Sequence, residues 1–172
     1  GHEIIGIVEQ LGNKIKTDLR GDKLSVGDRI TWTEYFHHGD LYYREIKDMP
    51  QKSKGVRKYG HDLVEDDPHF NGGFAEYCYI YPGTGILKLP DSISDEEATP
   101  LNCGVATMIA VIEAAEIKIG DSVVIQGLGL LGLYGCAIAK ANGAGMVIGL
   151  DSVDDRIRIS KKFGAVENIN VS

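Results

Sequence analysis

The sequence predicts a β-rich part, of barrel or sandwich type, followed by the first half of a doubly wound α/β domain with a parallel sheet. Up to about Pro90, short runs of β-branched and aromatic residues are separated by Gly, Asp and Pro turns. From Asp91, short apolar strands alternate with helical patterns, which is typical of βαβ units with right-handed crossovers. A glycine-rich turn joins the first of these strands to its helix. We therefore expect two domains, at residues 1–100 and 101–172.

The composition argues against several classes of partner. The 172 residues carry a net charge of -7, and an acidic surface repels the phosphates of nucleic acids and anionic membranes. The three cysteines are too few and too scattered for a disulfide framework, which favours a reducing cytoplasm. The most apolar region, residues 122–150, is broken by polar residues and glycines, so no membrane span is expected. The composition thus predicts a cytoplasmic protein with no nucleic-acid or membrane partner.

Four strands are expected in the β-rich part. They are EIIGIVEQ (3–10), DRITWT (28–33), GFAEYCYI (73–80) and TGILKLP (84–90). Turn residues bound each run, and no long stretch has a helical period of 3.6. Cys78 lies in the middle of the third run, where we expect it to be a packing residue.

The α/β part begins at a helix-start signal, with Asp91 or Ser92 as the cap and acidic residues in the first turn. A buried helix is expected to begin just after Cys103. The pattern then predicts strands over 122–126, 146–151 and 166–171, a turn and helix over 127–142, and an amphipathic helix that ends at Gly164. Cys136 lies inside the first of these helices and is expected to pack in the core.

The stretch VVIQGLGLLG contains G-x-G-x-x-G, at Gly127, Gly129 and Gly132. The motif is weak alone, but here it follows an apolar strand and opens a helix, and Asp151 ends the next strand. The first glycine would permit the tight turn, the second would let a pyrophosphate approach, and the third would let helix and strand pack closely. The Asp151 carboxylate would accept ribose hydroxyls and repel a 2′-phosphate, which favours NAD over NADP. The alternative is a structural βαβ crossover with incidental glycines.

Cys103 lies where a helix is expected to start, and the helix dipole would stabilise the thiolate that binds metal. The alternative is a small buried hydrophobic residue. His2 and Glu3 strengthen the metal interpretation, because imidazole and thiolate are natural zinc ligands. Two ligands do not complete a catalytic zinc site, which takes three from the protein and keeps one position open.

Several motifs in order resemble those of the medium-chain, zinc-dependent alcohol dehydrogenase family. They are GHEIIGIVEQLG, VGDRI, NGGFAEY, PLNCGVAT, VVIQGLGLLGL and GLD. The resemblance covers essentially the whole chain. It implies a GroES-like β-barrel catalytic domain joined to a Rossmann domain, and the oxidation of a small-molecule alcohol with NAD(P). The segments RKYGHD and GGFAEYCYIYPGT are similar to the branch associated with phosphonate metabolism.

The resemblance also implies roles for individual residues. His2 and Cys103 would be catalytic-zinc ligands, and Glu3 would be the adjacent acid that can swing onto the metal. In the cofactor domain, nicotinamide contacts would come from Thr107 and Leu131, and adenosine-ribose contacts from Asp151 and Arg156. A homo-oligomer is expected for the full-length protein.

Two departures from the family pattern lead to further expectations. Family members carry an earlier β-rich segment with the first zinc-binding cysteine and the proton relay, and a sheet of six strands. We therefore expect an internal piece of a longer protein, and expect residues 1–172 alone neither to oxidise alcohols nor to hold zinc tightly. Many family members hold a structural zinc with four cysteines, whose places are taken here by His38, Leu41, Arg44 and, with a one-residue shift, Ser53, so that zinc is expected to be lost. A site from His37, His38 and Asp40 is an alternative, although adjacent exposed histidines are more often only solvated.

The sequence therefore predicts an NAD-dependent oxidoreductase with one catalytic zinc per subunit, which oxidises an alcohol to an aldehyde or ketone. Zinc would act as a Lewis acid, and the nicotinamide would accept hydride. Two alternatives stay open: a zinc-free member similar to quinone reductases, and a truncated remnant without catalysis.

Overall fold

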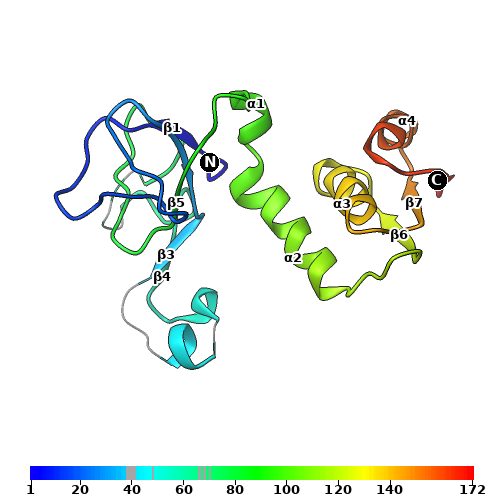
Figure 1. Cartoon of the computed structure of the whole chain (residues 1–172), viewed down its shortest axis with the longest axis horizontal. Helices are drawn as coiled ribbons and strands as arrows, with labels where there is room; N and C mark the ends of the chain where they lie inside the picture. The colour runs from blue at the N-terminus through cyan, green and yellow to red at the C-terminus, as the bar shows by residue number, and fades with distance from the viewer. Residues whose placement is uncertain (38–41, 48, 66, 68, 70) are drawn as a thin grey trace. The chain divides into compact units, whose positions relative to one another are not determined.

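The computed structural model describes residues 1–37, 42–47, 49–65, 67, 69 and 71–172. The chain forms two compact units, Gly1–Cys103 and Gly104–Ser172, drawn from blue to green and from green to red in Figure 1. The first unit carries antiparallel strands and the second a parallel sheet. The expected combination of a GroES-like part with a partial Rossmann sheet is confirmed.

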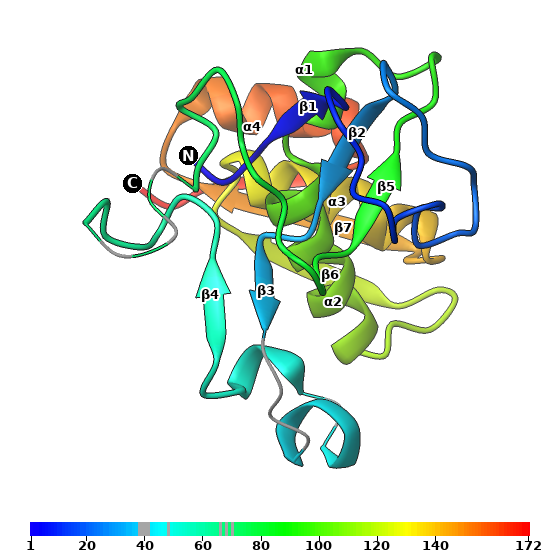
Figure 2. The ribbon, with the colours of Figure 1, turned by 90° about the vertical axis from the view of Figure 1, so that its left-hand side faces the viewer.

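The first unit is built on a three-stranded antiparallel sheet. Its order is β1 (Ile5–Ile7), β2 (Arg29–Trp32) and β5 (Ile86–Lys88), and Figure 2 shows β2 between its two neighbours. The hairpin of β3 (Tyr35–His37) and β4 (Val56–Lys58) follows, with a π-helical turn at Tyr42–Ile46 and a 3-10 turn at Pro50–Lys52 between its strands. Three of the expected β runs thus contain strands, because each finds an antiparallel neighbour.

The core of this unit is aromatic and aliphatic. The Tyr59 ring is fully buried, and its hydroxyl lies 2.7 Å from the Thr84 hydroxyl and accepts the Tyr81 amide at 2.8 Å. The other buried members are Ile4, Val8, Leu24, Ile30, Trp32 and Phe36. Buried Tyr59 therefore satisfies its polar end while its ring packs in the core.

The strand expected over residues 73–80 is wrong, since the structure has no strand there. Phe74, Tyr77 and Tyr79 expose 97%, 74% and 69% of their surface, while Cys78 and Ile80 are only partly buried and pack against the core from an irregular segment. The flanking amides bond elsewhere, Gly73 to the Gly1 carbonyl at 2.8 Å and Tyr81 to the Tyr59 hydroxyl. A strand pattern without a paired neighbour does not form a stable strand.

The helix expected after Pro90 is short, and its cap is Ser94 rather than Asp91 or Ser92. Helix α1 spans Asp95–Ala98, and the Ser94 hydroxyl accepts the Glu97 amide at 3.2 Å while the Glu97 carboxylate accepts the Ser94 amide at 3.0 Å. The reciprocal pair satisfies two otherwise free donors; of the three candidate caps, Ser94 is the one followed three residues later by the longer glutamate side chain that a capping box uses.

The second unit has the expected parallel sheet. Its order is β6 (Ser122–Gln126), β7 (Met146–Asp151) and β8 (Glu167–Asn170). Helix α3 (Leu130–Ala141) joins β6 to β7, and α4 (Asp154–Ser160), extended by a 3-10 turn at Lys161–Phe163, joins β7 to β8. Gly164 ends this helix with φ of 97°, a left-handed cap that glycine adopts freely. Leu128, Cys136 and Val147 are fully buried in the core, so the packing role expected of Cys136 is confirmed.

Helix α2 (Ala106–Ala114) is less buried than expected and begins later, after a π-helical turn at Leu101–Val105. Only Met108 and Ile112 are buried on it, whereas Ile109 and Val111 expose 43% and 50% of their surface. It is apolar all round but packs on one side, against α3. Among the described residues, no helix has the length and apolar character to cross a bilayer.

Candidate metal and cofactor sites

Three potential metal donors meet in the first unit. His2 precedes β1, Cys103 lies in the π-helical turn, and Glu34 stands between β2 and β3. His2 Nε2 lies 3.2 Å from Cys103 Sγ, and one ligand atom from each of the three residues lies within 4.8 Å of the others. All three side chains are partly buried. Residues at opposite ends of this unit thus form one cluster.

Asn102 fastens the backbone around this cluster. Its side-chain amide donates to the His2 carbonyl at 2.8 Å and to the Trp32 carbonyl at 3.1 Å. The residue next to Cys103 in the chain therefore ties the segment of His2 to the end of β2, two residues before Glu34. Two hydrogen bonds from one planar amide fix the spacing of the three segments.

His61 lies between two of the three donors, His2 and Glu34. Its Nε2 lies 3.0 Å from His2 Nδ1 and 3.1 Å from Glu34 Oε1. The backbone before it is close to the N-terminal segment, because Gly60 has φ of 70° and a Cβ there would collide with the Gly1 carbonyl. Only glycine permits both this conformation and this approach. Gly60 therefore allows the segment after β4 to place His61 beside His2.

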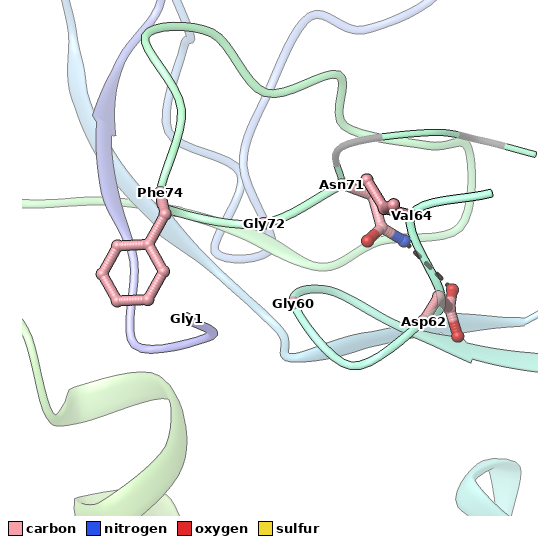
Figure 3. Close-up of a pocket in the computed structure, with 7 residues that line it drawn as sticks. All are labelled: Gly1, Gly60, Asp62, Val64, Asn71, Gly72 and Phe74. Atoms are coloured by element: carbon pink, nitrogen blue, oxygen red, sulfur yellow. Dashed lines mark hydrogen bonds between the residues drawn. The ribbon is translucent and has the colours of Figure 1, made fainter. Parts of the chain in front are cut away.

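A pocket of about 160 Å³ lies beside this crossing, and Figure 3 shows Gly1, Gly60 and Gly72 at its wall. Its polar side chains bond to each other: Asn71 Nδ2 donates to Asp62 Oδ2 at 3.0 Å, and Asp62 also accepts Arg57 Nε at 2.8 Å. None of the three metal donors lines the pocket. The pocket is therefore lined by the segments next to His2 and His61 and does not include the donor cluster.

The surroundings of Cys103 oppose the thiolate stabilisation that is expected from a helix start. Burial raises the pKa of the Cys103 thiol, and the carboxylates of Glu34 and Glu3 raise it further. Cys103 is the third residue of a π-helical turn rather than the first residue of a helix, and acidic neighbours oppose a second negative charge. A bound cation would supply the missing opposite charge.

The cluster is suitable for zinc. Tetrahedral zinc with bonds of about 2.0–2.3 Å separates a nitrogen and a sulfur ligand by roughly 3.5 Å, close to the 3.2 Å between His2 Nε2 and Cys103 Sγ. Imidazole, thiolate and carboxylate are all zinc ligands. Glu3 is exposed and is not part of the cluster.

The glycine turn of the second unit has the features of a dinucleotide cradle. Gly127 has φ of 89°, and a Cβ on Gly132 would overlap the Gly127 carbonyl oxygen. Around Gly129 a Cβ would meet nothing within 4 Å, and α3 begins at the next residue. The turn therefore needs glycine at its two ends, while its middle glycine leaves room at a helix N-terminus where phosphates bind.

Asp151 lies at the end of β7 and is 7% exposed. Its Oδ2 accepts the Leu128 amide at 2.6 Å and its Oδ1 the Val153 amide at 2.9 Å, while Arg156 Nη1 lies 3.8 Å away. The Leu128 and Val153 amides, and then Arg156, hold the pKa of Asp151 below its usual range. The carboxylate is thus ionised and fastened to the glycine turn, with lone pairs left for a ligand.

The remaining residues expected to contact cofactor are accessible. Thr107 on α2 is exposed, Leu131 on α3 is 45% exposed, and the Arg156 side chain on α4 is 54% exposed. Each lies in the second unit, as Asp151 does.

Sequence reasoning missed Glu34, His61 and Asn102. No spacing motif marks them, and they reach His2 and Cys103 only through the hairpin and the chain crossing. Asn102 had one usable signal, its position next to a candidate ligand.

The structural-zinc prediction falls largely outside the described residues. His38, Asp40 and Leu41 lie there, as do the side chains of His37 and Arg44. Ser53 is buried, with no hydrogen-bond partner for its hydroxyl among the described residues. Loss of this zinc, and the alternative histidine site, stay predictions.

Comparison with known proteins adds independent information. No protein-family model matches the sequence. The chain is 32% identical over 168 residues to an alcohol dehydrogenase of Geobacillus stearothermophilus, a match covering 96% of this chain and 44% of that protein. It is 32% identical over 173 residues to L-threonine 3-dehydrogenase of a Marinomonas species, covering 100% of this chain and 46% of that protein.

A solved structure agrees with these relatives. The crystal structure of an alcohol dehydrogenase from Thermotoga maritima superposes with a TM-score of 0.91 at 29% identity, over 99% of this chain and 47% of that one. The chain spans about half the length of the curated relatives it matches. With the glycine turn and its acid on one unit and the donor cluster on the other, these similarities identify the chain as a member of the medium-chain alcohol dehydrogenase family.

Proposed function

We propose that the protein containing this chain oxidises a small-molecule alcohol to an aldehyde or ketone, with zinc at the His2–Cys103 cluster and NAD at the glycine turn. The observation that carries the proposal is the 3.2 Å approach of His2 Nε2 to Cys103 Sγ, across 101 positions of sequence. When bound, zinc supplies a Lewis acid that lowers the pKa of an alcohol hydroxyl, and NAD supplies the hydride acceptor.

The residues of this chain would have distinct tasks. His2 and Cys103 would hold the metal, and Asn102 would keep their segments in place through its bond to the His2 carbonyl. Thr107 and Leu131 would contact the nicotinamide, as the family resemblance implies. Asp151 would accept the ribose hydroxyls, and Arg156 would lie beside it.

NAD is preferred over NADP in this proposal. Asp151 presents a carboxylate with a lowered pKa at the end of the second parallel strand, where a 2′-phosphate would meet negative charge. The single positive charge of Arg156 is not enough to reverse this preference, because its Nη1 already lies 3.8 Å from Asp151 Oδ2. The branch associated with phosphonate metabolism, the homo-oligomer and the cytoplasmic location stay predictions.

The test is NAD-coupled oxidation of a panel of primary and secondary alcohols by the protein expressed from the complete reading frame. Formation of NADH that depends on alcohol, and that stops when a chelator removes the metal, is the expected result. Reduction of quinones by a nicotinamide cofactor in metal-free protein would instead support the quinone reductase alternative. Binding of NAD without turnover of any alcohol or quinone would support a non-catalytic remnant.

A further inference from the structure

We propose that Glu34 is a zinc ligand of this chain, so that residues 1–172 carry a three-donor site made of His2 Nε2, Cys103 Sγ and the Glu34 carboxylate. This inference rests on the proposed function, because it assumes that the cluster binds zinc. It replaces the expectation of weak zinc binding, which counted only two ligands. The observation behind it is that donor atoms of the three residues lie within 4.8 Å of one another.

Glu34 is held where a ligand must be. Its backbone carbonyl accepts the Tyr59 amide at 2.9 Å, and the next residue, Tyr35, pairs with Lys58 in the β3–β4 register. Its side chain is 20% exposed, so the carboxylate is largely removed from bulk water. A carboxylate in such a position is stabilised by cationic partners. Lys58 Nζ is only a distant one, at 3.8 Å.

The charges of the cluster favour a divalent cation. A ligand oxygen of Glu34 and Cys103 Sγ lie within 4.8 Å of each other, so two anionic ligands at this spacing would repel each other unless a cation lay between them. Zinc would neutralise both at once, and coordination takes the thiol as its thiolate.

The proton positions around His61 also favour Glu34 as a ligand. If His2 Nε2 held a zinc ion, the ring proton of His2 would be on Nδ1 and would donate to His61 Nε2, 3.0 Å away. His61 Nε2 accepts that bond and cannot also donate to Glu34 Oε1, which lies 3.1 Å from it. The Glu34 carboxylate would then be without this hydrogen bond, and its oxygens would be available to hold a cation. His61 is a positioning residue that orients the His2 ring.

The experiment measures metal binding by the 172-residue chain itself. Cobalt(II) is added first, because a bound thiolate gives a charge-transfer band, and zinc affinity follows from competition with a coloured chelator. Cys103→Ser should lose the band. Glu34→Gln should keep the band and weaken zinc binding by about 10-fold or more, at least as much as loss of an outer partner. Glu9→Gln removes a carboxylate from an exposed position and should leave the affinity unchanged.

Two further measurements keep the result unambiguous. Thermal unfolding of the metal-free variants shows whether Glu34→Gln is folded, and Glu34→Asp, which keeps a carboxylate, should recover part of the affinity. Equal zinc affinity of folded Glu34→Gln and the unaltered chain overturns the inference and leaves the proposed function standing. No thiolate band and no zinc binding in the unaltered 172-residue chain also overturn the inference, whereas the proposed function is overturned only if the protein expressed from the complete reading frame binds no zinc either.

Discussion

In the proposed function, the preference for NAD over NADP depends on Asp151. Replacing it with serine removes both the acceptor for the ribose hydroxyls and the negative charge that opposes a 2′-phosphate. We expect Asp151→Ser to weaken NAD binding by roughly 10-fold to 100-fold, since a lost hydrogen bond to a charged group is worth about 1.5–3 kcal/mol, and to improve NADP binding. Calorimetric titration with both nucleotides measures the ratio.

The matched control for this change is Asp155→Asn. Asp155 is an exposed acid in the first turn of α4, four residues after Asp151. It pairs at the surface with Arg158, at 3.1 Å. It should leave the NAD to NADP ratio unaltered. A stronger preference for NADP in the unaltered protein would contradict the role given to Asp151.

Asp18 makes an acid-sensitive contribution to the first unit. The backbone amides of Lys88, Asp22 and Arg20 donate to its carboxylate, and the Lys88 bond does most to hold the pKa of Asp18 below its ordinary 3.8. A carboxyl group with a lowered folded pKa stabilises above its unfolded pKa, and the contribution disappears as pH falls through the folded value. Stability should therefore decline below about pH 4 less steeply in Asp18→Asn. Urea unfolding at pH 7 and at pH 3 gives the loss of unfolding free energy between the two pH values for each protein. An equal loss in the unaltered protein and in Asp18→Asn would contradict this prediction.

In the strand–turn–helix element at Gly127–Gly132, two glycine substitutions are expected to have different effects, one on the stability of the fold and the other on NAD binding. In Gly132→Ala the new methyl group meets the Gly127 carbonyl, and such overpacking costs about 1–3 kcal/mol of unfolding free energy. In Gly129→Ala the methyl group meets no protein atom within 4 Å, so the fold should keep nearly all of its stability while the pyrophosphate loses its close approach.

Chemical denaturation and NAD titration of the two variants check this difference. The second variant should bind NAD at least 10-fold more weakly, roughly the effect of 1.4 kcal/mol. Unchanged NAD affinity in Gly129→Ala would show that the phosphates lie elsewhere.

Elements whose signals are local could be predicted from the sequence, and those that depend on a distant partner could not. The βαβ pattern from Ser122 to Asn170 is confirmed, because each strand, turn and cap has its own local signature. Residues 73–80 have a strand pattern but no pairing partner among the described residues. The cap of α1 was placed two or three residues early because only the reciprocal pair of Ser94 and Glu97 distinguishes it.

The same distinction holds for the candidate sites. The glycine turn and Asp151 are joined by one βαβ unit, so a spacing rule could find them. His2 and Cys103 were found through their residue types and the family resemblance. Glu34 and His61 come from the β2–β3 connection and the segment after β4, and only the folded chain brings them beside His2.

At the scale of the whole molecule, the proposed activity requires one metal and one nucleotide in the same protein, on two different units of this chain. The unit Gly1–Cys103 contains the donor cluster, and the unit Gly104–Ser172 contains the glycine turn. Neither site alone can oxidise an alcohol, because one lacks the hydride acceptor and the other lacks the Lewis acid. Alcohol oxidation should therefore fall in proportion to the loss of either bound zinc or bound NAD.

The most direct test is to measure zinc content and alcohol-dependent NADH formation in the same preparation of the complete protein, unaltered and as Cys103→Ser. We predict one zinc per subunit in the unaltered protein, and in Cys103→Ser a loss of zinc together with at least a 100-fold fall in kcat/KM, equivalent to about 2.7 kcal/mol of transition-state stabilisation. Undiminished NADH formation by zinc-free Cys103→Ser protein would contradict the account.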